Sequence, residues 1–187
     1  MSYTEKQRAY HLRKMRTCIK RFDTDKDGYY TIEDVELMSE RLKEYGKLTE
    51  EQADRARQAF MKYGEMSGLL KPGEKVPVEE LAQKASEVML SMSADERKAM
   101  LHATHEIMFD VIDLNKDGHI SLEEYKVHFR VLGVNVSDEE VVHAFNTIDT
   151  DKNGEISREE FMAASDDFYN GVEETEVSRV FLGHLED

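Results

Sequence analysis

The sequence predicts an all-α fold in which four helix–loop–helix units associate in two pairs. Three observations support this prediction. Helix start signals recur along the chain, whereas no alternating strand pattern extends beyond a few residues. Three segments repeat one template of a polar loop followed by an apolar helix. The only two prolines, Pro72 and Pro77, lie in one loop and interrupt no helix.

The predicted helices begin at capping signals. In these signals a Ser or Thr is followed three residues later by Glu or Gln, and the two residues satisfy each other's free backbone amides. Glycines stand where several helices should end, because glycine readily adopts the backbone conformation of a helix C terminus. The starts are Thr4, Thr49, Ser93, Ser137 and Ser157, and the stops are Gly46, Gly133 and Gly171.

The net charge of the chain indicates which kinds of partner it can bind. Asp and Glu number 40 against 25 Lys and Arg, which gives a formal charge of −15 for the 187 residues. Such an excess repels the phosphates of nucleic acids and of anionic membrane surfaces, so we expect neither as a partner. It suits a protein that gathers carboxylates around a hard cation.

Targeting and cysteine signals are sparse. No run of 18 apolar residues predicts a membrane span, and the N-terminal stretch lacks the apolar segment of a secretory signal. We therefore expect a cytoplasmic monomer. The single cysteine, Cys18, has no partner for an intramolecular disulfide. Its helical neighbours Met15 and Ile19 predict a buried packing position.

One template occurs three times in the chain, as FDTDKDGYYTIEDVEL, IDLNKDGHISLEEYKV and IDTDKNGEISREEFMA. An aspartate opens each loop, a glycine follows five residues later, and an apolar residue comes two positions after the glycine. The pattern is that of the EF-hand, with twelve-residue loops at 23–34, 113–124 and 149–160. The last two loops have the spacing of a paired unit. The interval after the first loop has room for one further hand.

The residue types at each loop position fit calcium. Ca²⁺ takes six to eight oxygen ligands, and the loop supplies them from positions 1, 3, 5, 7, 9 and 12 around a sharp turn at glycine 6. Thr31, Ser121 and Ser157 occupy position 9. The other predicted ligands, with position 7 acting through its backbone carbonyl, are Asp23, Asp25, Asp27, Tyr29 and Asp34; Asp113, Asn115, Asp117, His119 and Glu124; and Asp149, Asp151, Asn153, Glu155 and Glu160.

The three loops are not equivalent. Asp34 at position 12 is one methylene shorter than glutamate, so a bidentate grip requires the first loop to contract. Contraction weakens Ca²⁺ binding or favours Mg²⁺, which takes six ligands at shorter distances. We expect three calcium sites, with magnesium as a second candidate for the first and the better calcium sites in the third and fourth hands.

The second hand is predicted to lie within residues 49–91 and to bind no metal. Aligning Val76 with loop position 8 and Glu80 with position 12 places Leu69, Lys71 and Gly73 at positions 1, 3 and 5, where no carboxylate is present. We expect this hand to pair with the first, Tyr30 meeting Val76, as Ile120 meets Ile156 in the other pair. The predicted division is 1–92 for the N-terminal pair and 93–187 for the C-terminal pair with its lid segment.

No catalytic constellation is recognisable, so we expect no enzyme activity. The chain has no glycine-rich phosphate loop, GxSxG or HExxH motif. His102 and His105 are spaced to share a helix face and hold zinc, but no further ligand completes such a site. The ten methionines, together with the aromatic residues, fit either an ordinary core or a flexible apolar cavity for a ligand.

The chain resembles the superfamily of invertebrate sarcoplasmic calcium-binding proteins, calexcitins and calcium-regulated photoproteins. The stretches QRAYHLRKMRTCIKRFD, AFNTIDTDKNGEISREEF and DDFYNGVEETEVSRVFLGHL are more similar to the calcium-dependent coelenterazine-binding (luciferin-binding) proteins of sea pansies. This resemblance implies that the four hands form one compact globule around an apolar cavity. It further implies that the cavity holds coelenterazine, and that calcium makes this ligand available to a separate luciferase. Photoproteins oxidise their own luciferin with His–Trp–Tyr groups. Met15, Ser165, Tyr169 and Phe181 occupy those places here, and the chain contains no tryptophan.

Two function classes stay open. One is a calcium-triggered carrier of coelenterazine or a similar small hydrophobic molecule, which the resemblance favours. The other is a calcium and magnesium buffer or sensor without such a ligand, because a homologue can keep a fold and lose a ligand. In the carrier mechanism Glu124 and Glu160 move onto their loops, the following helices rotate, and a lid at Val177–Leu185 loosens.

Overall fold

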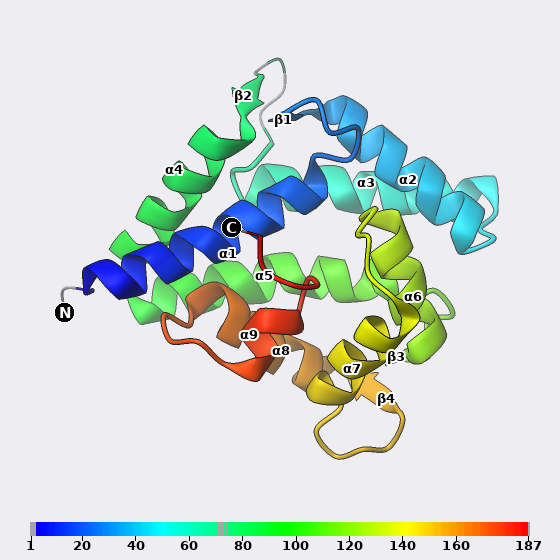
Figure 1. Cartoon of the computed structure of the whole chain (residues 1–187). Coiled ribbons are helices and arrows are strands. Elements are labelled where there is room, and N and C mark those ends of the chain that lie inside the picture. The colour runs from blue at the N-terminus through cyan, green and yellow to red at the C-terminus, as the bar shows by residue number, and fades with distance from the viewer. Residues whose placement is uncertain (1–2, 71–72, 74, 187) are drawn as a thin grey trace.

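The computed structural model describes residues 3–70, 73 and 75–186, and most of these residues are helical (Figure 1). In the N-terminal half, two helices flank the first loop and two more form the second hand. A two-residue strand lies within the first loop, and another precedes the last helix. The elements are α1 (Glu5–Phe22), β1 (Tyr29–Tyr30), α2 (Ile32–Tyr45), α3 (Glu50–Met66), β2 (Val76–Pro77) and α4 (Val78–Ser91).

The C-terminal half repeats this order and adds a short helix. The third and fourth hands each contain a helix, a loop with a three-residue strand, and a second helix. The elements are α5 (Ala94–Ile112), β3 (His119–Ser121), α6 (Leu122–Val131), α7 (Asp138–Ile148), β4 (Glu155–Ser157), α8 (Arg158–Asn170) and α9 (Glu176–Val180). The predicted division of the chain at residues 92 and 93 falls between α4 and α5, and it stays a prediction.

The predicted helix signals are confirmed. Thr4, Thr49, Ser93, Ser137 and Ser157 are all N-caps, and each forms a reciprocal capping box with the Glu or Gln three residues later. α2 and α8 end immediately before Gly46 and Gly171. α6 ends slightly before the predicted stop, with Leu132 as its C-cap and Gly133 in the left-handed conformation at φ 63°.

Short antiparallel bridges join the loops in pairs, as predicted from loop position 8. Tyr30 pairs with Val76 in the N-terminal half, and Ile120 pairs with Ile156 in the C-terminal half. The two strands of each bridge lie side by side in Figure 1. The second hand therefore contributes to the structure of the first, although positions 1, 3 and 5 of its own loop have no carboxylate. Of its equivalent positions, Leu69 packs against the core and Gly73 has φ 78°, while Lys71 lies outside the described residues.

One apolar core joins the two halves. α1 packs along α4 and α2 along α3, and contacts of α3 with α5 and of α2 with α6 connect the halves. Phe22 of α1 lies against Tyr63 of α3 with ring centroids 5.5 Å apart. The buried apolar residues of all the long helices belong to one cluster. The chain is thus a compact all-helical globule, as the sequence predicts.

The C-terminal segment returns to the first helix. After α9 the chain runs beside α1, where the C terminus lies in Figure 1. Arg13 donates to the carbonyl of Glu186 at 2.8 Å, Arg21 donates to the carbonyl of Leu182 at 3.2 Å, and the Glu186 amide donates to the Thr17 hydroxyl at 3.0 Å. These bonds hold the segment on α1 and so complete the globule.

Candidate metal loops and ligand cavity

The three predicted loops share one backbone conformation. The lysine at position 4 is left-handed in each, at φ 61°, 63° and 58°, and the glycine at position 6 follows at 90°, 90° and 89°. A β-carbon on any of these glycines would meet no atom within 4 Å. Backbone conformation, and not lack of space, therefore requires glycine. The lysines are Lys26, Lys116 and Lys152, and the glycines are Gly28, Gly118 and Gly154.

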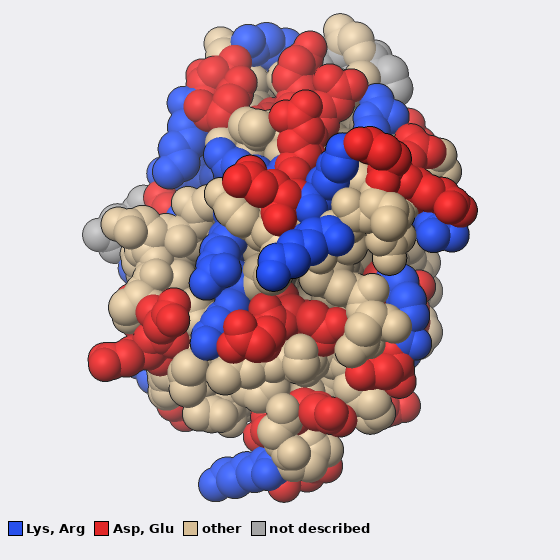
Figure 2. All heavy atoms as spheres, turned by 90° about the vertical axis from the view of Figure 1, so that its right-hand side faces the viewer, with Lys and Arg blue, Asp and Glu red and all other residues tan. Residues whose placement is uncertain are grey.

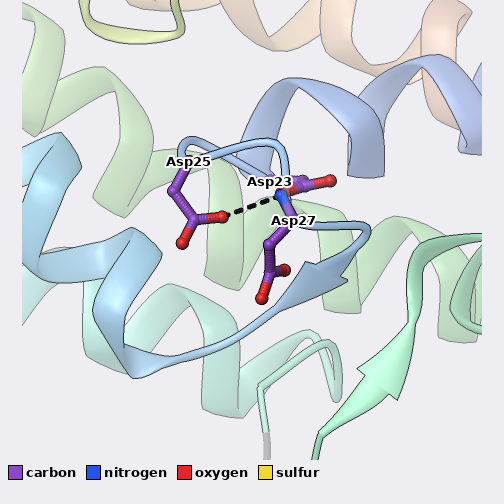
Figure 3. Close-up of side chains that lie close together, drawn as sticks. All are labelled: Asp23, Asp25 and Asp27. Atoms are coloured by element: carbon purple, nitrogen blue, oxygen red, sulfur yellow. Dashed lines mark hydrogen bonds between the residues drawn. The ribbon is translucent and has the colours of Figure 1, made fainter.

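The first loop brings three carboxylates together. Asp23, Asp25 and Asp27 each have an oxygen within 4.8 Å of the others (Figure 3). The Asp25 carboxylate accepts from the amide of Asp27 at 2.9 Å, the bond drawn in Figure 3. Asp23 Oδ2 accepts from the Gly28 amide at 3.0 Å, whereas the buried Oδ1 has no hydrogen-bond partner.

The electrostatics of this loop favour a cation. Burial raises the pKa of Asp23, and repulsion from the carboxylates of Asp34, Asp25 and Asp27 raises it further, although the Gly28 hydrogen bond opposes the shift. A divalent cation would relieve this repulsion and give the unpartnered oxygen of Asp23 a ligand bond. The oxygen-only set of donors is the one that Ca²⁺ and Mg²⁺ take in proteins. The residues present therefore fit a hard divalent cation.

The side chain at position 12 reaches across its loop in all three hands. Asp34 Oδ1 accepts from the Thr24 amide at 2.7 Å, and Oδ2 accepts from the Thr31 amide at 2.8 Å. Glu124 makes the same two kinds of bond, to Leu114 at 3.0 Å and to Ser121 at 2.8 Å. The shorter Asp34 thus spans its loop, and it is fully buried. This contact is consistent with the loop contraction that the sequence predicts.

The fourth loop gathers its acidic side chains as the first does. Asp149, Asp151 and Glu160 bring one oxygen each to within 4.8 Å of one another. Burial of Glu160 opposes ionisation, but hydrogen bonds from Ser157 and Thr150 prevail and lower its pKa to about 2. Glu160 is therefore a charged carboxylate at neutral pH, as a position-12 ligand has to be.

The remaining predicted ligands lie where the loop pattern expects them. Asn115 and Asn153 at positions 3 and 5 each accept from a loop amide two residues on, at 2.8 Å. Asp113 accepts from Gly118 at 3.0 Å, and Asp117 accepts from His119 at 3.0 Å. The position-7 residues Tyr29, His119 and Glu155 lie in the short strands. The assignment of all fifteen residues as calcium ligands stays a prediction.

An apolar cavity opens among α1, α3, α4 and α5. Its volume is ≈ 280 Å³, near the lower end of the range for small-molecule sites. The outer wall is formed by exposed or half-buried residues of the α3 end and of α4. The inner wall is buried. The lining comprises Met15, Cys18, Ile19, Tyr63, Ser67, Gly68, Leu69, Leu81, Lys84, Ala85, Val88, Met89, Met100, Leu101, Thr104, His105 and Tyr169.

Polar atoms cluster on the cavity floor. The His105 Nδ1 lies 3.1 Å from the carbonyl of Leu101, while the buried Nε2 has no hydrogen-bond partner. The ring of His105 lies between those of Tyr169, at a centroid distance of 4.5 Å, and Tyr63, at 5.9 Å. Burial lowers the pKa of His105 to about 4, so its imidazole is neutral at pH 7. The floor therefore contains a neutral imidazole with one nitrogen that has no partner in the protein.

The structure rejects two alternative chemistries. Cys18 Sγ lies 3.3 Å from the Tyr169 hydroxyl, and burial raises the pKa of the thiol to about 12. Cys18 is therefore the buried packing residue that the sequence predicts and not an activated nucleophile. His102 and His105 do not form a common zinc site, because His102 is exposed beside Glu106 at 3.7 Å whereas His105 is buried in the core.

A smaller void continues inward from the floor. Its volume is ≈ 20 Å³, and its lining shares Tyr63, His105 and Tyr169 with the larger cavity. Phe181 and Leu182 of the C-terminal segment line this void. Among the described residues, none of 177–185 lines the larger cavity. The lid expected at Val177–Leu185 does not cover the wider cavity, because the segment lies against α1 and α8. That it closes the small inner void stays a prediction.

The molecular surface carries mixed charge. On the face drawn in Figure 2, acidic and basic side chains alternate, and the described residues form no continuous basic surface there. This distribution is unlike a nucleic-acid interface. None of the helices in the described part of the chain is long and apolar enough to cross a membrane.

Comparisons with known proteins agree with this geometry. The fold and the loops define a four-hand EF-hand protein, and the family model for an EF-hand domain pair matches residues 102–165. The luciferin-binding protein of Renilla reniformis is 43% identical over 182 residues, which cover 97% of this chain and 98% of that protein. The chain therefore belongs to the luciferin-binding protein family of EF-hand proteins.

One solved structure and one further protein sequence are also similar to this chain. The crystal structure of the calcium-loaded apo coelenterazine-binding protein from Renilla muelleri superposes with a TM-score of 0.89 at 42% identity, covering 98% of this chain and 100% of that one. The sarcoplasmic calcium-binding protein of Perinereis vancaurica tetradentata is 28% identical over 125 residues, covering 66% of this chain and 70% of that one. The resemblance deduced from the sequence is thereby confirmed.

The sequence missed three features of the site. The left-handed lysines at position 4 carry no side-chain signal, since lysine is not a residue that favours this conformation. His105 is buried in the core, and the apolar residues Leu101 and Met108 on the same side of its helix are the sequence signal for that position. Lys75 lies beside the first loop, 2.8 Å from Asp27, and only the bridge between Tyr30 and Val76 could have placed it there.

Proposed function

We propose that this protein binds calcium at three EF-hand loops and carries a coelenterazine-type luciferin, which it releases when calcium binds. One observation carries the proposal: an apolar cavity lies among the helices of the hands, and its lining includes His105, whose buried Nε2 has no hydrogen-bond partner in the protein. The relatives at 43% and 42% identity are luciferin- and coelenterazine-binding proteins by name, which supports the same ligand class here.

The calcium part of the proposal assigns the fifteen predicted ligands to three sites. Support comes from the common backbone of the loops, from the unpartnered oxygen of Asp23 and from the carboxylate groups in the first and fourth loops. Bound calcium supplies the charge that holds the carboxylates of positions 1, 3 and 5 together with that of position 12. Because Asp34 spans the first loop, magnesium is a second occupant proposed for that site alone.

The ligand part rests on the chemistry of the cavity. An aromatic luciferin with phenolic and carbonyl groups needs apolar contacts and a few hydrogen bonds. Met15, Ile19 and Met89 supply the apolar contacts, and methionine adapts its shape to irregular aromatic ligands. We assign His105 Nε2 and the Tyr169 hydroxyl as the polar contacts. The neutral imidazole can donate or accept, according to its tautomer.

Cavity and loops share the same helices. Ile19 lines the cavity on α1, which ends at the first loop, and His105 lines it on α5, which ends at the third. Tyr169 lies on α8, which follows the fourth loop. Any rotation of these helices on calcium binding therefore moves residues that contact the ligand. This arrangement supports calcium as the trigger of release.

We infer that the protein is a carrier and not an enzyme. The chain contains no tryptophan, and Met15, Ser165, Tyr169 and Phe181 stand where the resemblance places the His–Trp–Tyr groups of photoproteins. A separate luciferase is then the proposed receiver of the ligand. A monomeric state and a cytoplasmic location stay predictions.

A titration with coelenterazine tests the proposal. Absorbance and tyrosine emission of the purified chain are followed in a chelator and again in excess calcium. Saturable one-to-one binding that weakens in calcium supports a triggered carrier. Equal binding in both conditions would mean that the protein carries the ligand but that calcium does not control its release. Absence of binding in both overturns the carrier and leaves a calcium and magnesium buffer, the class to which the sarcoplasmic relative belongs by name.

A further inference from the structure

The fully exposed lining residues of the cavity lie on one side. Gly68, Lys84 and Val88 are exposed, and they belong to the turn after α3 or to one face of α4. The half-buried lining residues are Ser67, Leu69 and Ala85 beside them and Met100 near the start of α5. The lining from α1, α8 and the rest of α5 is buried. The cavity therefore has a mouth between the α3 end and α4, the two helices of the second hand.

The α3 side of this mouth is held by a compact turn. The amides of Leu69 and Leu70 both donate to the Gly64 carbonyl, at 3.0 and 2.9 Å. Gly64 accommodates the turn because a β-carbon there would lie 2.7 Å from the β-carbon of Leu70. The α3 rim is thus fixed to its own helix, which packs along α2.

The α4 side is fixed to the other helix of the first hand. The Val78 amide donates to the carbonyl of Gly28 in the first loop at 2.9 Å. Arg16 of α1 binds Glu79 at 2.7 Å, and His11 of α1 binds Ser86 in the core at 2.8 Å. The first contact joins the start of α4 to the first loop, and the other two join α4 to α1, so α4 and α1 are held together.

These contacts connect the mouth to the first loop. The loop joins α1 to α2, α1 holds α4, and α2 holds α3. Calcium changes the angle between the two helices of a sensor hand. A wider angle between α1 and α2 therefore separates α4 from α3 and widens the mouth.

We propose that the ligand enters and leaves between the α3 end and α4, and that the first calcium loop controls this passage. The proposal rests on the carrier function and adds the route and the controlling site. The third and fourth loops flank helices that supply buried lining, so they shape the floor. Asp34 in the first loop thereby acquires a role in setting the calcium level at which the mouth widens.

Two substitutions in α4 test the route. Ala85→Trp places a bulky ring in the mouth, whereas Gln83→Trp, two residues away on the exposed face, is the matched control. Coelenterazine association and dissociation are followed by stopped-flow absorbance in the chelator. We expect Ala85→Trp to slow both rates at least tenfold, and Gln83→Trp to leave both within twofold. Val88→Ala, which widens the mouth, should speed both rates.

The outcomes separate the route from the carrier function. If the wild type binds no coelenterazine, the carrier function fails. If it binds and Ala85→Trp keeps wild-type rates, the route alone fails. Should Ala85→Trp abolish equilibrium binding by filling the cavity, Val88→Ala decides: faster association and dissociation with an unchanged ratio support the route, and unchanged rates overturn it.

Two matched substitutions at loop position 3 test the controlling site. Asp25→Ala removes a ligand from the first loop, and Asp151→Ala removes its equivalent from the fourth. Calorimetry should show two calcium ions per chain for each variant in place of three. We expect calcium to accelerate ligand dissociation in Asp151→Ala as in the wild type, and the acceleration to fall at least tenfold in Asp25→Ala. The reverse pattern, or an equal loss in both, would overturn control by the first loop.

Discussion

Nζ of Lys75 lies 2.8 Å from Oδ2 of Asp27, and the two residues belong to different hands of the N-terminal pair. The ammonium also lies 4.3 Å from the ring centroid of Tyr29. The second hand therefore places a positive charge beside a predicted calcium ligand of the first loop. This hydrogen bond lowers the pKa of Asp27 and competes with a metal for its carboxylate.

Replacing Lys75 should strengthen metal binding at the first loop. Lys75→Met frees Asp27, and because both side chains are exposed we expect only about a two- to fivefold gain in calcium affinity. The gain should disappear in 1 M salt, which screens exposed charges. Calorimetry measures both effects. Lys98→Met, with the same loss of charge on the exposed surface of α5, is the control, and an equal gain in that variant would refute a local effect.

The stoichiometry of calcium provides a second prediction. We expect three ions per chain, because the described positions Leu69 and Gly73 of the second hand offer no side-chain oxygen. Native mass spectrometry counts the ions, and Glu124→Gln or Glu160→Gln should each weaken its own site sharply. A fourth ion that persists after all three loops are inactivated would contradict this prediction.

Lengthening the side chain at position 12 should change the first site in particular. Asp34→Glu restores a ligand that grips calcium without contraction of the loop, so we expect calcium affinity to rise on the order of tenfold and magnesium affinity to fall. The buried position of Asp34 makes the extra methylene a packing change as well. Competition of the two metals, followed by calorimetry, measures the selectivity. Unchanged selectivity would show that position 12 does not limit this loop.

Acid should destabilise the chain through its buried histidines. Burial lowers the pKa of His11, His105 and His128 to about 4, below the ordinary value of 6.5. The unfolded chain therefore binds more protons between pH 6.5 and pH 4, and the free energy of unfolding falls across this interval as the pH decreases. Each histidine contributes on the order of 1–3 kcal/mol.

Urea denaturation in a chelator at several pH values measures this loss. His105→Gln should reduce the change in the free energy of unfolding with pH. His102→Gln, at an exposed position on the same helix, should leave this change as in the wild type. Equal slopes for the two variants would mean that burial of His105 does not set its protonation.

The C-terminal segment should contribute both stability and closure. Phe181 packs against Phe168 and Phe161 at centroid distances of 5.4 and 5.7 Å. We expect Phe181→Ala to lower the free energy of unfolding by about 3–5 kcal/mol. Truncation after Glu176 should also speed coelenterazine loss without calcium, because it uncovers the inner void. The experiment compares dissociation rates with those of Leu185→Ala, and identical rates in the truncated and full-length chains would exclude closure.

The sequence predicts well where local chemistry determines the structure. The capping residues and the bridge between Ile120 and Ile156 follow from patterns within a few residues, and all are found in the structure. The sequence does not distinguish an apolar cavity from an ordinary core, because apolar residues recur with the same helical period in both. Whether Met89 packs or lines a hollow depends on how α4 lies against α3 and α5, which is a property of the tertiary structure.

The position of the C-terminal segment shows the same limit. Its apolar residues Phe181 and Leu182 predict burial, and both are buried. Which opening they cover depends on distant partners such as Arg21 and Thr17 on α1. No local pattern encodes these contacts, so the sequence alone does not show which opening the segment lies against.

The tyrosines on the cavity floor make the intrinsic fluorescence of the protein sensitive to a bound ligand. The chain has eight tyrosines and no tryptophan, so its ultraviolet emission comes from tyrosine alone. Tyr63 and Tyr169 line the cavity, where a bound chromophore whose absorption overlaps tyrosine emission would receive their excitation energy. Occupancy can therefore be followed by the dimming of this emission, without a label and without an added luciferase.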